Sequence, residues 1–163
     1  MVPTRFLLMG LLTPIAVRLG QTTWMPKLLP QVVWLDKKMA WVSRGRFTVL
    51  DLAGLPNVTL TVPGRKSGIP RTAPLLAIPY DGGWLIAGSY FGAPTSPAWV
   101  ANLRAVDQAQ LTVKGEEFQA HWRELEDEDR ARAWQAMLDV WPNYAIYERR
   151  SNRKIPVFHM TRG

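Results

Sequence analysis

The chain has 163 residues, of which 47% are hydrophobic and eight are Trp, so it has the apolar area that a disordered protein lacks. It contains no Cys, which excludes disulfides, thiolate nucleophiles and Cys-ligated metals, and redox chemistry would therefore need a bound organic cofactor. The formal net charge is +7, and residues 1–50 carry most of it, with seven Lys or Arg against a single Asp.

A basic, apolar extension over residues 1–45 precedes the predicted main domain, residues 46–163. Its apolar run from Phe6 to Leu12 is much shorter than the roughly 20 residues needed to cross a bilayer. No small-x-small cleavage site follows, so a helix at a membrane surface or packed on the domain is favoured over a signal peptide. Three Trp interleaved with lysines fit either a membrane interface or packing on the barrel: Trp24, Trp34 and Trp41.

Short β-type runs separated by turn residues fill most of the chain from Phe47 onward. Asp81-Gly82 predicts a tight hairpin, because Asp-Gly tolerates the positive φ of such turns, and Lys114-Gly115 is expected to form another. Many short strands joined by tight turns favour an antiparallel barrel over a parallel βαβ sheet. The fold class is therefore predicted as mainly β with helical inserts (α+β). The predicted strands are 47–51, 58–62, 71–80, 83–88, 109–115, 117–125 and 155–160.

Two helices are expected to interrupt the β pattern. The first spans 94–105, with Ser96 as its cap and Pro97 in its first turn. The second spans 126–140, where the acids fit the positive end of the helix dipole better than a metal site. Its buried side is predicted to be Ala131, Trp134 and Leu138.

The two histidines, His121 and His159, lie in strand-like runs without metal-ligand spacing. They are interpreted as structural, and no metal is expected. The basic leader carries no helix-turn-helix, RNP-type or zinc-finger signature, so a nucleic-acid partner is not expected either.

The segment "TVPGRKSGIPRTAPL" (61–75) concentrates Arg65, Lys66 and Arg71 on a glycine-bounded turn. Backbone N–H groups and charge-assisted donors on such a turn suit a phosphate or carboxylate. The Lys precedes the second Gly, so the turn is not a Walker loop. An anion cradle and a solvated basic hairpin tip remain alternatives on the turn alone.

Three segments in order, "GRKSGIPRTAPL" (64–75), "GSYFGAPTSPAWVANL" (88–103) and "WPNYAIYERRSNRKIPV" (141–157), resemble the deazaflavin (coenzyme F420)-dependent nitroreductase and quinone reductase family of actinobacteria. The resemblance covers about residues 45–160. It implies a split β-barrel of the FMN-binding type. The implied activity is hydride transfer from C5 of reduced F420 to a quinone, a conjugated enone or a nitroaromatic.

The resemblance also implies the site residues. The phosphate and the start of the oligoglutamate tail would meet Arg65, Lys66, Ser67 and Arg71. The ring system would lie beside Thr72, Ala73, Pro74, Leu75 and Leu76. Further contacts would come from Ala87, Gly88, Ser89, Tyr90, Ala98, Trp99, Val100, Ala101, Asn102 and Tyr144. Tyr144 and Tyr147, with Trp141 nearby, would wall the substrate pocket, and a Tyr hydroxyl, Ser89 or water would deliver the proton.

The alternatives are an FMN- or haem-binding protein on the same barrel, and a non-catalytic module that docks on a membrane surface. The expected location is cytoplasmic, with peripheral contact at the inner face of the membrane if the leader binds lipid.

Overall fold

The computed structural model describes residues 13–22, 27, 31, 34–35, 38, 49–52 and 54–163. The apolar run Phe6–Leu12, Trp24 and Trp41 lie outside these residues. The helices are α1 (Thr13–Gly20), α3 (Val49–Leu52), η2 (Tyr90–Gly92), α4 (Ala98–Leu103), α5 (Asp127–Val140) and α6 (Asn143–Ser151). The strands are β1 (Asn57–Pro63), β2 (Pro70–Leu76), β3 (Ile78–Tyr80), β4 (Gly83–Ala87), β5 (Gln108–Val113), β6 (Glu116–Glu124) and β7 (Val157–Arg162).

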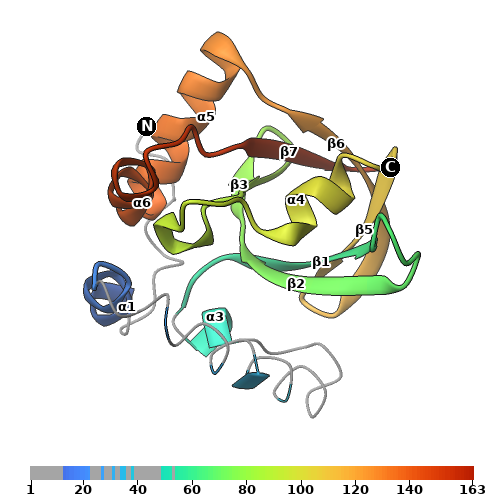
Figure 1. Cartoon of the computed structure of the whole chain (residues 1–163), viewed down its shortest axis with the longest axis horizontal. Helices are drawn as coiled ribbons and strands as arrows, with labels where there is room; N and C mark the ends of the chain where they lie inside the picture. The colour runs from blue at the N-terminus through green and yellow to red at the C-terminus, as the bar shows by residue number, and fades with distance from the viewer. Residues whose placement is uncertain are drawn as a thin grey trace.

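The strands form one antiparallel sheet in the order β2-β1-β5-β6-β7-β4-β3, and the sheet curls into an incomplete barrel (Figure 1). Two of its hairpins have two-residue turns with positive φ at both positions, Asp81-Gly82 and Lys114-Gly115. This geometry matches the right-handed twist of paired strands. Both sequence-predicted hairpins are confirmed.

The barrel is split where β2 passes into β3. Ala77 is buried between the two strands, and its N–H donates to the carbonyl of Pro56 at 2.9 Å. Before this residue the chain pairs with β1, and after it the chain pairs with β4. The single strand predicted over 71–80 is therefore two strands on different parts of the sheet.

The inner face of the curled sheet encloses the main hydrophobic core. Side chains alternate along β1, where Val58, Leu60 and Val62 point inward and are buried. Helix α4 lies across the opening of the curl (Figure 1) and adds Trp99 and Val100 to this core. The period-2 pattern of the sequence is thus the inside-outside alternation of a barrel.

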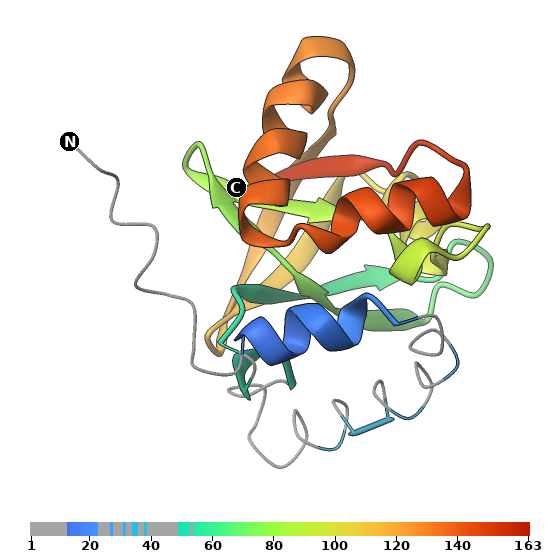
Figure 2. The same cartoon turned by 90° about the vertical axis from the view of Figure 1, so that its left-hand side faces the viewer.

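A second core lies on the outer face of β3, β4 and β7, where α5 and α6 pack. Helix α1 lies beside α6 (Figure 2), and Asn143 Nδ2 donates to the Val17 carbonyl at 2.7 Å. The first helix of the leader is therefore docked on the domain.

Three further sequence-based expectations about helices and strands are wrong in whole or in part. The strand predicted over 47–51 is replaced by α3 from residue 49, because its β-type residues find no partner strand. Helix α4 begins only at Ala98, and its N-cap is Pro97. Ser96 does not cap the helix with its side chain, because the extended residue Pro97 lies between Ser96 and the first helical residue. In α5 the predicted Trp134 and Leu138 are half-buried against the outer core, but the fully buried residues are Ala133 and Met137, and Ala131 is exposed.

Candidate functional site

The β1–β2 turn, residues 64–69, is closed by its own backbone. Gly64 N–H donates to the Ile69 carbonyl at 2.9 Å, and Gly68 N–H donates to the Gly64 carbonyl at 2.7 Å. A Cβ on Gly64 would come within 2.8 Å of Ser67 Oγ, so glycine at this position leaves room for the Ser67 side chain inside the turn. The turn is tight and internally bonded.

These internal bonds change which groups of the turn can bind an anion. Gly64, Arg65, Ser67, Gly68 and Ile69 all donate their N–H groups to acceptors within the protein. Among the residues of the turn, Lys66 is the one whose N–H has no acceptor in the described part of the chain. The sequence-based interpretation therefore expected more backbone N–H groups to be available for anion binding than the fold leaves. The cationic side chains remain as the donors.

The two cations of the turn, and Arg71 shortly after it on β2, are exposed. The side chains of Arg65, Lys66 and Arg71 form no ion pair with any carboxylate among the described residues. The Arg65 N–H donates to Oδ1 of Asn102 at 3.1 Å, and Asn102 is only 8% exposed. The turn is thereby fixed against α4 while its charges stay free for a ligand.

The segment Arg71–Leu76 follows the turn on β2, an edge strand of the sheet. Among the described residues one side of β2 has no partner strand, so backbone groups there are available to a ligand. Arg71 and Thr72 are exposed, whereas Ala73 to Leu76 are half-buried. The gradient from charged and exposed to apolar and half-buried suits a molecule with an anionic end and a planar ring.

The end of β4 and the loop after it lie against α4. A Cβ on Gly88 would come within 2.7 Å of Val100 Cγ2 and 2.9 Å of Pro156 Cγ, so glycine permits this contact. Tyr90 follows in a left-handed conformation with φ of 46° and is 42% exposed. The predicted residues 87–90 and 98–102 are thus brought together, and Arg65 joins them through Asn102.

The predicted contacts on α4 divide into two groups. Trp99 and Val100 face the inner core, with the Trp99 ring 5.7 Å from that of Phe158. Their packing in the inner core holds α4 in place beside the candidate site. Ala98 is exposed and Ala101 half-buried, so these two positions are the accessible part of the helix.

Tyr144 and Tyr147 lie on α6 in the outer core and are 3% and 2% exposed. Their rings meet edge to face at 6.2 Å, and the Tyr147 ring lies 5.8 Å from that of Phe91. Ala87 and Leu76 belong to the same cluster. The structure thus places the two Tyr behind the end of β4, buried, with their hydroxyls in the packed interior.

Burial controls the ionisation of both phenols. Desolvation raises the pKa of Tyr144 well above its ordinary value, with a further contribution from Tyr147. Desolvation also raises the pKa of Tyr147, against hydrogen bonding from Trp141 and Asn143 and the positive charge of Arg150. A phenol is already protonated at neutral pH at its ordinary pKa of 10.0, so the raised pKa makes both groups weaker acids and leaves them as hydrogen-bond donors that cannot act as bases.

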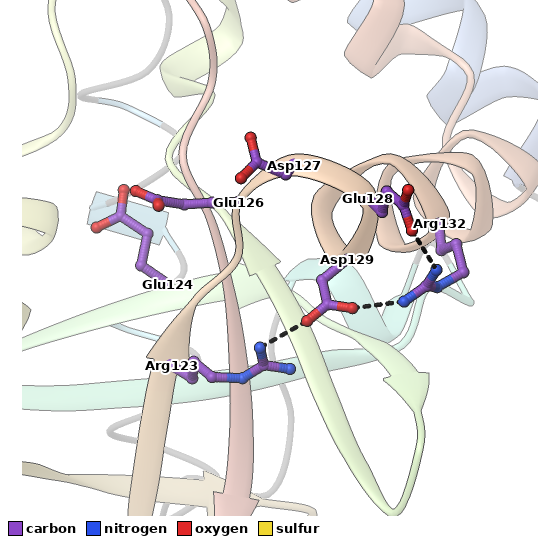
Figure 3. A pocket seen from close by; sticks show the side chains of 7 residues that line it. All are labelled: Arg123, Glu124, Glu126, Asp127, Glu128, Asp129 and Arg132. Carbon is purple, nitrogen blue, oxygen red and sulfur yellow. Dashed lines mark hydrogen bonds and ion pairs between the residues drawn. The ribbon is translucent and has the colours of Figure 1, made fainter.

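One hollow formed by described residues lies away from the predicted site. A shallow hollow of about 530 Å³ at the start of α5 is lined by Arg123, Glu124, Glu126, Asp127, Glu128, Asp129 and Arg132 (Figure 3). Asp129 pairs there with Arg123 at 2.7 Å and with Arg132 at 2.5 Å. No sequence-predicted site residue lines it. The acids belong to a paired, solvated helix start, as expected.

His159 Nε2 lies 3.0 Å from the Tyr80 carbonyl, and its ring packs edge to face on that of Tyr80. His121 lies on the exposed face of β6, with its ring nitrogens 3.4 Å from the Gln108 amide. These contacts agree with structural roles.

Sequence reasoning missed Arg150 and Arg153, whose guanidinium groups hold the loop that follows β4. The motif containing them was recognised, but cations near the end of a helix are ordinarily explained by the helix dipole. Only the fold shows which carbonyls they reach.

Comparison with known proteins gives consistent results. The family model described as F420H(2)-dependent quinone reductase matches residues 36–162. An F420H(2)-dependent quinone reductase of Mycobacterium tuberculosis is 34% identical over 110 residues, which is 66% of this chain and 74% of that protein. A putative F420H(2)-dependent quinone reductase of Mycobacterium bovis matches to the same extent.

A solved structure, that of the F420-H2 dependent reductase FDR-A, superimposes with a TM-score of 0.59 and 32% identity over 64% of this chain and 93% of that one. This likeness confirms the predicted split barrel. The chain belongs to the F420H(2)-dependent quinone reductase family, and it is a reductase whose cofactor is coenzyme F420.

Proposed function

We propose that this protein passes a hydride from reduced F420 to a quinone, and that conjugated enones and nitroaromatics are also acceptors. The observation that carries the proposal is a set of three cations without an ion-pair partner among the described residues, of which Arg65 and Lys66 lie on a turn fixed against α4 and Arg71 lies at the start of β2. Exposed cations without carboxylate partners suit the phosphate and carboxylates of the F420 tail. When bound, the reduced cofactor supplies a hydride from C5 of its ring.

Successive parts of the site would contact successive parts of the cofactor, from its anionic tail to its ring. Arg65, Lys66 and Arg71 would hold the anionic tail, and β2 from Thr72 to Leu76 would lie beside the ring. Gly88, Ser89 and Tyr90 would contact the opposite edge with backbone and hydroxyl groups, and the accessible face of α4 would close the site. Ser67 shapes the turn, because its Oγ accepts from the Ile69 N–H at 3.3 Å.

The acceptor would bind on the side of α6, where Tyr144, Tyr147 and Trp141 gather. Reduction of a quinone or an enone leaves negative charge on oxygen, and a proton must follow. Both phenols are protonated at neutral pH, as a tyrosine is at its ordinary pKa of 10.0, and burial raises the pKa of each further, which keeps the proton on the phenol until negative charge develops beside it. A phenol hydroxyl, Ser89 or water would deliver this proton.

The leader would bring the enzyme to its acceptor at a membrane surface, at the inner face of the cell membrane. Ile15 and Leu19 occupy one exposed side of α1, and Trp34 and Leu35 are exposed as well, at 42–57% for the four. Lys38 Nζ lies 4.4 Å from the centre of the Trp34 ring, and such apolar and cationic groups suit an anionic lipid interface. No helix in the described ranges is long and apolar enough to span a membrane.

The test is stopped-flow oxidation of reduced F420 by a menaquinone analogue, a cyclic enone and a nitroaromatic, with NADPH and reduced FMN as alternative donors. We expect turnover of the quinone with F420 alone. Absence of turnover of all three acceptors, despite tight F420 binding, would contradict the proposed acceptors. Turnover with reduced FMN at an equal rate would favour the FMN-type alternative.

A further inference from the structure

We propose that Arg153 is a positioning residue that holds the loop of residues 88–95 in the shape required for cofactor binding. Its guanidinium reaches four backbone carbonyls of this loop. Nη2 donates to Gly88 at 2.9 Å, to Ser89 at 3.1 Å and to Thr95 at 3.3 Å, and Nε donates to Ala93 at 3.2 Å. Both ends of the loop are therefore tied to one side chain.

The end of α6 directs this side chain toward the loop. Asn152, the C-cap of α6, has φ of 49° and ψ of 36°, a left-handed conformation that ends the helix and turns the chain. Arg153 follows directly. A planar guanidinium with its donors in a fixed fork can bridge several carbonyls at once, which an ammonium group cannot do.

The loop needs such support because its backbone is strained. Tyr90 and Phe91 both have left-handed backbones, with φ of 46° and 54°. Non-glycine residues are found in this region at an energetic cost, and they persist where the surroundings hold them. Arg150 adds to this hold, since its Nη1 donates to the Phe91 carbonyl at 3.2 Å.

The contacts of Arg153 fit a role in holding the loop better than a role in stabilising the whole fold. Among the described residues no carboxylate pairs with its charge, and Nη1 is buried without an acceptor. Partial burial also lowers the pKa of this guanidinium. A desolvated, unpaired cation is a costly way to stabilise a fold. Its position is better explained by the one segment that all its bonds reach.

That segment contains Ser89 and Tyr90, so the inference rests on the proposed function where it concerns F420 binding. Tyr90 is both strained and exposed, and its side chain therefore adds little to either core. Strain at an exposed residue is typical of a ligand site. Arg153 would fix the direction in which this residue and Ser89 meet the cofactor.

The experiment compares the full-length parent with Arg153→Lys, which keeps the charge, and Arg153→Gln, which keeps a planar donor group. Arg149→Ala, an exposed cation in the last turn of α6, four residues before Arg153, is the matched control. Hydrogen exchange of the cofactor-free protein should show the Gly92 and Ala93 amides exchanging at least tenfold faster in both Arg153 variants. These amides donate to Ser89 and Tyr90 within the loop. The amides of β5 and β6 should be unchanged.

Fluorescence titration with F420 should show a rise in Kd of about tenfold in Arg153→Lys, and steady-state kinetics should show a higher KM for reduced F420 with kcat kept within about twofold. Exchange and affinity at the parent level in Arg153→Lys would overturn the inference, as would equal acceleration of all amides. If the Arg153 variants do not fold, Arg150→Lys is measured in the same two assays, because Arg150 holds the same loop through the Phe91 carbonyl. If the parent binds no F420, the proposed function fails, while exchange in the cofactor-free protein still decides the role of Arg153.

Discussion

The two cations at the tip of the β1–β2 turn give the sharpest test of where the cofactor tail binds. The double variant Arg65→Ala/Lys66→Ala removes both side chains and leaves the turn closed by its own backbone bonds. Neither side chain forms an ion pair with a described residue, so folding should be little affected, within about 0.5 kcal/mol.

The expected loss of affinity follows from the exposure of the turn. Exposed ion pairs contribute about 0.2–1 kcal/mol each, and charge-assisted hydrogen bonds shielded from water about 1.5–3 kcal/mol. With about 1 kcal/mol for each of the two side chains, the double variant loses about 2 kcal/mol, or about 30-fold in Kd. Because solvent screens these charges, the difference should shrink between about 0.1 M and 1 M salt.

The assay is a fluorescence titration with F420 at both salt concentrations. The control is Lys114→Asn/Arg149→Ala, which removes the same charge from exposed sites outside the turn, with Asn chosen because it tolerates the positive φ of Lys114. The control should bind F420 with the affinity of the parent. An unchanged Kd in the turn variant, or an equal loss in the control, would refute the assignment of the tail to this turn.

Replacing Asn102 by Ala frees the turn from α4, which should cost about 0.5–1.5 kcal/mol of stability and lower Tm by about 2–4 °C per kcal/mol, with weaker F420 binding. Thermal unfolding and titration at the parent values would contradict this role. Tyr144→Phe and Tyr147→Phe should lower kcat about tenfold or more with the Kd for F420 kept, as measured by stopped-flow; parent rates in both would leave proton delivery to another group. Burial raises the pKa of Tyr144 above its ordinary value of 10.0, so its contribution to stability is complete below pH 10 and is lost as the pH rises further. Urea unfolding from pH 9 to 11 should show a steeper loss of stability with rising pH for the parent than for Tyr144→Phe. The parent should bind anionic liposomes, and this binding should weaken as the salt concentration rises. Removal of residues 1–40 should abolish the binding. If the truncated protein still sediments with the vesicles, the leader has a structural role instead of a membrane-binding one.

Local chemistry in the sequence determined much of the barrel. The Asp81-Gly82 and Lys114-Gly115 turns were predictable because few residue pairs tolerate positive φ at both positions. The alternation along Val58–Val62 predicted a strand with one buried face, since the side-chain period of a strand is two. The cationic turn and its order relative to the later motifs indicated the family.

Contacts between distant segments decided the rest. Residues 49–52 have β-type composition but form a helix, because a strand depends on a partner that the sequence does not specify locally. The split at Ala77 depends on the carbonyl of Pro56, far enough along the chain that no short pattern links them. Asn102 meets Arg65 across 37 residues, and Arg153 meets the loop after β4 across 58 to 65. The barrel alone brings these groups within hydrogen-bonding distance, so the arrangement of the site was decided by tertiary structure.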